Sequence, residues 1–254
     1  MSNLTQDEVL RNILDGSITE LESDQCAQIY YRRLQGCSQL ESASFENCEI
    51  IYESAFESCS ALEVIDAPAV IRLDQATFRN CASLKKVHFE HFKNASSSRE
   101  LHYLFQNCTK LKVAVTYDCS MYGGDYIFSG DSELEALDFN SYNGRFVGRY
   151  STLQNCTNLA TIVIRDSTKV YALANTPTFN GTPFASGKSG GTIYLPKVLY
   201  DELGTGSALD YKSATNWSVI DGYGTITWEQ LEGSQYENYY VDGTPINSGG
   251  GITA

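Results

Sequence analysis

Residues 56–62 read Phe-Glu-Ser-Cys-Ser-Ala-Leu, and residues 78–84 read Phe-Arg-Asn-Cys-Ala-Ser-Leu. The same order of Phe or Leu, Cys three places on and Leu six places on returns at residues 34–40, 105–111 and 153–159, and residues 128–134 follow it with Asp131 in place of Cys. The steps between successive Leu are 22 (62−40), 22 (84−62), 27 (111−84), 23 (134−111) and 25 (159−134) residues. A repeat of this length cannot bury its apolar side alone, and therefore indicates a solenoid of stacked coils.

Each of these Leu residues begins a short stretch in which the first, fourth and sixth residues are apolar, as in Leu62, Ile65 and Ala67. This spacing is typical of a short strand entered from a turn, so we expect the strands of successive coils to stack into one parallel sheet. A second inward-pointing column is expected eight residues after the Ile or Leu that begins each coil. Its members are Cys26, Cys48, Val70, Phe92, Cys119 and Tyr142. From Ile18 to a Gly-rich variant of the unit at residues 184–195, the sequence predicts about eight coils.

Helical caps are expected at both ends of the solenoid, which we place at residues 17–196. Residues 1–16 combine a capping box, Thr5-Gln-Asp-Glu8, with an apolar stripe and a terminal Gly16, which predicts a helix. Apolar residues after Pro196 predict a helical cap over residues 197–221. Residues 222–254 are expected to form a small Tyr-rich module, in which residues 225–228 and 237–241, before Asp242-Gly243, form a hairpin-like pair, followed by a flexible Gly-rich tail.

The repeat resembles the BspA-type leucine-rich repeat, whose unit reads roughly Leu-x-x-Leu-x-Leu, a variable stretch and Ala-Phe-x-x-Cys. Ala55-Phe56-Glu-Ser-Cys59 matches that ending, and the likeness covers roughly residues 17–220. It implies an α/β solenoid, a right-handed horseshoe with the parallel sheet on its concave side. It also implies adhesion or recognition without enzymatic activity as a rule, as in bacterial surface proteins and bacteriophage particle proteins. The chain departs from the pattern at Asp131, which replaces Cys, and at Leu34 and Leu153, which replace Phe. We therefore expect the coil that contains Asp131 and the Gly-rich residues 121–124 to be locally irregular.

The composition excludes several classes of function. The 254 residues contain 31 acidic and 18 basic side chains, a net charge of −13. This balance argues against nonspecific binding to nucleic acid or to anionic membranes, because phosphate neutralisation needs clustered Lys and Arg. The sequence contains no apolar run long enough to span a membrane, and its first residues do not read as a secretory signal. We therefore expect neither a nucleic-acid partner nor membrane insertion.

The eight cysteines are expected to be free thiols. Five occupy one position of the repeat and three occupy another, as small buried side chains in a tight turn would. Equivalent side chains of stacked coils point in parallel and not at each other, which argues against disulfides. No Cys-x-x-Cys pair is present, and a strand would place His88 and His91 on opposite faces, so no metal site is expected. No catalytic motif is visible, and the sequence predicts no catalytic residue and no cofactor.

A binding surface is expected where outward-pointing side chains of successive strands line the concave face of the sheet. We place the candidate ligand-binding residues there: Ser44, Asp66, Lys86, His88, Val115, Asp138 and Val163. Tyrosine is also abundant, with 17 residues, and its flat ring with a polar tip suits contacts with sugars or proteins. Possible aromatic contacts are Tyr117, Tyr122, Tyr126 and Tyr150, with ordinary packing between coils as the alternative.

The sequence thus predicts a non-enzymatic recognition or adhesion protein that binds a carbohydrate or protein on a cell surface. A bacteriophage tail or particle component that contacts the host fits a surface-type repeat without an export signal, which places the protein on a virion or a bacterial cell surface. The alternative is a structural decoration or scaffold subunit that docks to partner subunits through residues 222–254.

Overall fold

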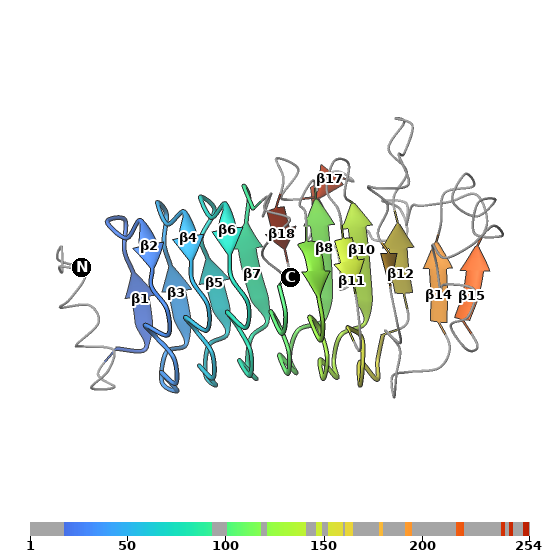
Figure 1. The fold of residues 1–254 in the computed structure, drawn as a ribbon, viewed down its shortest axis with the longest axis horizontal. Coiled ribbons are helices and arrows are strands. Elements are labelled where there is room, and N and C mark those ends of the chain that lie inside the picture. The colour runs from blue at the N-terminus through green and yellow to red at the C-terminus, as the bar shows by residue number, and fades with distance from the viewer. Residues whose placement is uncertain are drawn as a thin grey trace.

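A parallel β-solenoid of about five turns is the main feature of the computed structural model. The structure describes residues 18–92, 101–117, 121–140, 146–148, 152–159 and 161–164, together with short strands at 178–179, 191–194, 217–220, 240–241, 244–245 and 251–253. The turns stack along the long axis of the molecule, and their strands lie side by side (Figure 1). Eight coils remain a prediction, because most residues beyond 164 lie outside the described ranges.

Successive turns contribute parallel strands to one main sheet. These are β1 (Glu20–Glu22), β3 (Ser42–Ser44), β5 (Val64–Asp66), β7 (Lys86–Phe89), β8 (Val113–Tyr117), β10 (Ala136–Asn140), β12 (Thr161–Ile164), β14 (Gly191–Tyr194) and β15 (Trp217–Ile220). The first pairs keep a constant register, with Ala43 beside Leu21 and Ile65 and then Val87 beside Ile65. These central residues are buried, as the apolar spacing predicts.

Shorter strands form a second edge of the solenoid. Strands β2 (Gln28–Ile29), β4 (Ile50–Ile51) and β6 (Arg72–Leu73) pair in parallel, and β9 (Met121–Gly124), β11 (Phe146–Gly148) and β13 (Thr178–Phe179) do the same further along. The predicted second inward column lies just before the first group. Its members Cys26, Cys48, Val70 and Phe92 are buried, which confirms that part of the prediction, whereas Cys119 and Tyr142 lie outside the described residues.

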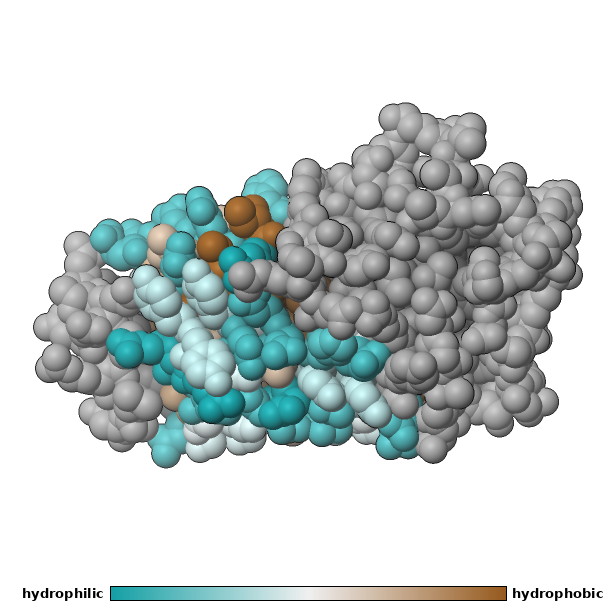
Figure 2. Space-filling view, viewed as in Figure 1, coloured by the Kyte–Doolittle hydropathy of each residue, from teal (hydrophilic) through white to brown (hydrophobic). Residues whose placement is uncertain are grey.

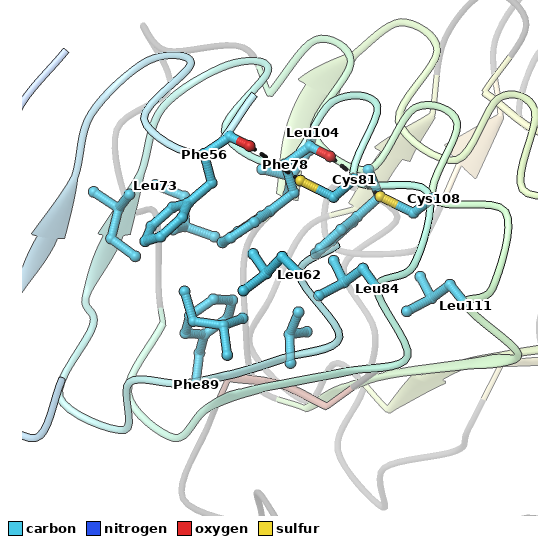
Figure 3. Packing of buried hydrophobic residues seen from close by; sticks show 14 of the residues in the cluster. Phe56, Leu62, Leu73, Phe78, Cys81, Leu84, Phe89, Leu104, Cys108 and Leu111 are labelled. Atoms are coloured by element: carbon cyan, nitrogen blue, oxygen red, sulfur yellow. Dashed lines mark hydrogen bonds between the residues drawn. The ribbon is translucent and has the colours of Figure 1, made fainter. Parts of the chain in front are cut away.

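A column of stacked rings forms the core beneath the repeated Phe position (Figure 3). The ring centroids of Phe56 and Phe78, Phe78 and Phe105, and Phe105 and Phe128 are each 5.6 Å apart, with interplanar angles of 17°, 8° and 11°. The ring of Phe89, on strand β7 of the main sheet, packs against the ring of Phe78, with the two centroids 5.9 Å apart. Each ring is fully buried, so the stack joins each turn to the next through both apolar burial and ring contact.

The repeated cysteines are free and buried, and they bind backbone of the preceding turn. The Sγ atoms of Cys59, Cys81, Cys108 and Cys156 donate to the carbonyl oxygens of Leu34, Phe56, Phe78 and Phe128, at 3.0, 3.1, 3.2 and 3.0 Å. Two of these bonds are drawn in Figure 3. All seven described cysteines are free and buried, as the repeat predicts. The repeat selects Cys because it is small, apolar and still a hydrogen-bond donor.

The residue before each repeated cysteine, and before Asp131 where it replaces cysteine, has a left-handed backbone. The φ angles there are +76° at Gly36, +64° at Ser58, +62° at Asn80, +61° at Asn107, +86° at Gly130 and +60° at Asn155. Gly and Asn tolerate this conformation best. Asn107-Cys-Thr and Asn155-Cys-Thr are therefore explained by the turn itself. The turn at Asp131 keeps the same backbone, since its N–H binds the Phe128 carbonyl at 3.2 Å. The irregularity expected in this coil is found in its strand at Met121–Gly124, whose pairing with β11 shifts register between Phe146 and Gly148.

The C-terminal part differs from the prediction in two places. Strand β18 (Gly251–Thr253) lies antiparallel between β7 and β8, although residues 251–253 were expected in the flexible tail. Strand β16 (Tyr240–Val241) pairs with β17 (Thr244–Pro245) across Asp242-Gly243. Residues 240–241 therefore pair with the strand that follows them and not with residues 225–228, as the sequence predicted.

The described residues contain no helix. The predicted cap at residues 1–16 lies outside the described residues. Within the predicted cap at residues 197–221, residues 217–220 form β15 and pair with β14, so the helical expectation is wrong there. The reason is that Trp217 and Val219 continue the alternation of the sheet, whose edge offers hydrogen bonds that a short helix could not replace.

Candidate binding surfaces

Most of the predicted sheet residues lie in one row across the main sheet. Glu22 lies beside Ser44, Ser44 beside Asp66, and Asp66 beside His88. The row continues through Thr253 of β18 to Val115, Asp138 and Val163. Lys86 lies on β7 two places before His88, in the neighbouring row beside Val64. The repeat therefore brings these residues together because every turn contributes the same two positions to one face.

His88 lies between two carboxylates on this face. Its Nδ1 is hydrogen-bonded to Asp66 Oδ1 at 2.9 Å, across adjacent strands, whereas its Nε2 lies 3.4 Å from Glu90 Oε1 and makes no hydrogen bond. Asp66 is exposed, while the His88 side chain is largely covered. The imidazole is thus held in one orientation at the surface, which reduces the conformational entropy that a ligand contact would cost.

A hollow lies beside this row, at the ends of β1, β3 and β5. Its volume is about 220 Å³, and its lining consists of Glu22, Ser23, Asp24, Ser44, Glu46, Asp66 and Pro68. Four of these seven residues carry carboxylates and none carries a positive charge. One of them, Asp66, contacts the imidazole of His88. The hollow therefore favours cationic or hydrogen-bond-donating groups of a ligand.

In the first turns part of this face is open, and Asp66 and Lys86 are exposed. Val113 and Ala136, which lie in the same row as Lys86 two places before Val115 and Asp138, are buried. The aromatic residues that the sequence singled out lie on different elements: Tyr117 ends β8, Tyr122 lies on β9, and Tyr126 lies in a turn where it stacks on Tyr103 at 5.4 Å. Tyr150 lies outside the described residues.

A second surface, on the first turns, was not predicted. Tyr30, Tyr31, Arg32 and Arg33 are four consecutive exposed residues, and Tyr30 and Tyr31 keep 54% and 53% of their surface exposed. Tyr30 stacks on Tyr52 at 5.8 Å. We call Tyr30, Tyr31, Arg32, Tyr52 and Arg72 the tyrosine–arginine surface. Seen as in Figure 1, the described first turns are otherwise mostly hydrophilic, with a small hydrophobic patch (Figure 2).

Arginines hold the rings of this surface in place. The guanidinium carbons of Arg32 and Arg72 lie 4.7 and 5.1 Å from the ring centroids of Tyr31 and Tyr52. Two hydrogen bonds of 3.0 and 2.9 Å join Arg72 to Asp74, whose carboxylate raises the pKa of the guanidinium. Tyr and Arg are the residues most enriched at protein interfaces. The sequence signal for this surface is Tyr-Tyr-Arg-Arg at residues 30–33, which lies outside the later coils where tyrosines are most frequent.

Further along the same side, an ion pair crosses two turns. Arg79 binds Glu57, and Gln35 of the preceding turn donates to the other oxygen of Glu57 at 3.0 Å. Burial opposes ionisation of Glu57, but the hydrogen bonds from Arg79 and Ser54 outweigh it and leave the pKa of this carboxyl below its usual value. This network orders the surface next to the tyrosines.

The described part of the chain contains no group of three or more His, Cys, Asp or Glu side chains placed to hold a metal ion. Nor does it contain a helix with the length and apolar character that a membrane span requires.

Comparison with known proteins identifies the family. The model of the BspA type leucine-rich repeat region, in six copies, matches residues 16–112 and 90–185. The chain belongs to the BspA-type leucine-rich repeat family. This BspA-type protein is similar in fold to a leucine-rich repeat protein from T. pallidum, with a TM-score of 0.52 and 18% identity over 76% of this chain and 86% of that one. A leucine-rich repeat protein from Bacteroides ovatus also matches, with a TM-score of 0.39 and 15% identity over 78% of this chain and 56% of that one. No curated protein matches.

Proposed function

We propose that this BspA-type protein is a non-enzymatic recognition protein that binds a carbohydrate or protein of a bacterial cell surface through the sheet face of its first turns. The observation that carries the proposal is the row of Glu22, Ser44, Asp66 and His88 beside the 220 Å³ acidic hollow. A repeat scaffold that presents varied polar side chains in register is suited to reading an extended ligand. Val115, Asp138 and Val163 extend the same row and are the proposed outer contacts.

The location that we propose is a bacterial cell surface or a bacteriophage particle, and more specifically a tail component that contacts the host. Its support is membership of a repeat family that is often surface-associated. Tyr117, Tyr122, Tyr126 and Tyr150 are proposed as additional aromatic contacts.

The experiment is binding of labelled protein to a panel of bacterial envelopes and purified surface glycans. A sheet-face variant carries Asp66→Ala, Lys86→Ala and His88→Ala, and a matched control carries Tyr31→Ala and Arg32→Ala. All the changed residues except His88, which is largely covered, are exposed, and circular dichroism checks that both variants fold. Selective binding that is lost only in the sheet-face variant supports the proposal. Binding that is lost only in the control would place the ligand site on the tyrosine–arginine surface.

A second candidate function is that of a structural decoration or scaffold subunit. The tyrosine–arginine surface favours it, because ordered Tyr and Arg side chains are typical of protein interfaces. Docking through residues 222–254 is the other proposed route. Absence of binding to every envelope and glycan would favour this function, and assembly that survives removal of residues 222–254 would exclude docking through them.

A further inference from the structure

Asp131 occupies a position at which the repeat otherwise places a cysteine. In four turns the thiol there donates to a backbone carbonyl of the preceding turn, and these carbonyls belong to the repeated Leu or Phe residue (Figure 3). By the same register, the carbonyl opposite Asp131 is that of Phe105. The turn that contains Asp131 lacks the thiol donor but keeps the acceptor.

The carboxyl group of Asp131 is completely buried, with 0% of the residue exposed. Its Oδ1 accepts a hydrogen bond of 2.8 Å from the backbone N–H of Cys108, which also donates to the Phe105 carbonyl at 3.0 Å. Its Oδ2 is buried and has no hydrogen-bond partner. An ionised carboxylate needs several donors, so a single shared N–H and an unpartnered oxygen leave the charge poorly compensated.

The surroundings offer no compensating charge among the described residues. The titratable groups that face Asp131 are the thiol of Cys108 from the turn before and the thiol of Cys156 from the turn after, and both are buried. The nearest ion pair in sequence joins Lys110 to Glu133 at the surface. Burial therefore raises the pKa of Asp131 well above its usual value, and the Cys108 N–H opposes this only in part.

We propose that Asp131 is an uncharged carboxylic acid in the folded solenoid, that its Oδ2–H replaces the missing thiol as donor to the Phe105 carbonyl, and that its ionisation is a pH switch which loosens this turn from its two neighbours. The switch lies in the middle of the solenoid, where the turns of Phe105, Phe128 and Leu153 meet. Its closed form is the protonated one, so acid pH holds the solenoid together.

The direction of the pH dependence follows from proton linkage. The unfolded chain loses the Asp131 proton near pH 4, whereas the folded chain keeps it to higher pH. The stabilising contribution is complete below about pH 4 and is lost as the pH rises toward the folded pKa. Over that range the unfolding equilibrium constant rises by up to about tenfold per pH unit from this one group.

The first test compares urea denaturation of the wild type, Asp131→Asn and Glu133→Gln at pH 5, 6, 7 and 8. An Asn amide keeps the shape, accepts from Cys108 and donates toward Phe105 without titrating. We expect the ratio of wild-type to Asp131→Asn unfolding constants to rise at least tenfold from pH 5 to pH 8. Glu133→Gln removes an exposed carboxyl two residues away and should keep the wild-type pH profile. Parallel curves for the wild type and Asp131→Asn would overturn the proposal.

The second test stands even if Asp131→Asn does not fold. Asp131→Cys restores the repeat, and the infrared difference between wild type and this variant at pH 7 should contain the carbonyl band of a protonated carboxylic acid. Hydrogen exchange of residues 105–111 and 128–134 should rise at least tenfold more between pH 5 and pH 8 in the wild type than in Asp131→Cys. A carboxylate band at pH 7, or equal pH dependence of exchange in both proteins, would contradict the switch.

Discussion

Phe78 shows how much of the stability depends on single residues of the repeat. Its ring contacts those of Phe56, Phe89 and Phe105, all within 6 Å between centroids. Its backbone N–H also binds the Leu104 carbonyl of the next turn at 3.0 Å. A side chain that takes part in two interfaces between turns contributes to both, since repeat stability is a sum of such interfaces.

We expect Phe78→Ala to lower the free energy of unfolding by about 3–5 kcal/mol, because it leaves a cavity between three rings. Urea denaturation followed by circular dichroism measures the change. Tyr31→Ala is the control, since Tyr31 is exposed, and it should change stability by less than about 0.5 kcal/mol. Similar losses in the two variants would show that the ring stack does not dominate the core.

At the scale of elements, strand β18 interrupts an otherwise regular sheet. It is the member that runs antiparallel, and it lies between β7 and β8, whose turns remain joined on the other side by the bond from Phe78 N–H to Leu104. Only the three residues 251–253 form the strand, so few hydrogen bonds hold it. A short strand of this kind is expected to open more easily than its neighbours.

We expect Ile252→Pro to speed amide hydrogen exchange at residues 87–89 and 115–117, because proline removes a donor and does not fit between two strands. Exchange at β3 and β5 should not change, since β18 does not pair with them. Ile252→Val is the control and should leave all four strands protected. Unchanged exchange at β7 and β8 in the proline variant would contradict the pairing with β18.

For the molecule as a whole, burial is not uniform along the solenoid. The cysteines of the first turn, Cys26 and Cys37, each keep 8% of their surface exposed, while Cys59, Cys81 and Cys108 keep none. The first turn has a neighbour on only one side among the described residues. Local opening is therefore expected to begin at this end and to be least frequent between Phe56 and Leu111.

We expect a thiol reagent at pH 8 to label Cys26 and Cys37 at least tenfold faster than Cys59, Cys81 and Cys108, as read by mass spectrometry of peptides. Burial raises the pKa of Cys59 to about 12 and also raises that of Cys37, so labelling requires opening of the structure. In urea without reductant all eight cysteines should react, and fewer than five would contradict free thiols. Faster labelling of the central cysteines would contradict opening from the end.

The residues themselves determined the repeating part of this fold. Phe56, Cys59, Leu62 and Ile65 predicted a turn, a buried thiol and a short parallel strand, because each coil must bury the same apolar positions against the next. The same regularity predicts Ser44, Asp66 and His88 in one row. Their spacing along the chain equals one turn, so their neighbourhood follows from local sequence alone.

Only the tertiary structure decided the contacts that the repeat does not encode. The stacking of Tyr30 on Tyr52 under Arg72, the insertion of residues 251–253 between β7 and β8, and β15 in place of a helix all depend on which groups meet across turns or from distant segments. The setting of Asp131 belongs here too. Its sequence position marked a departure from Cys, but the unpartnered Oδ2 and the missing cation are properties of the packed turns around it. Periodic burial can be read from a single chain, whereas the pairing of polar and aromatic groups depends on side chains that the fold brings together.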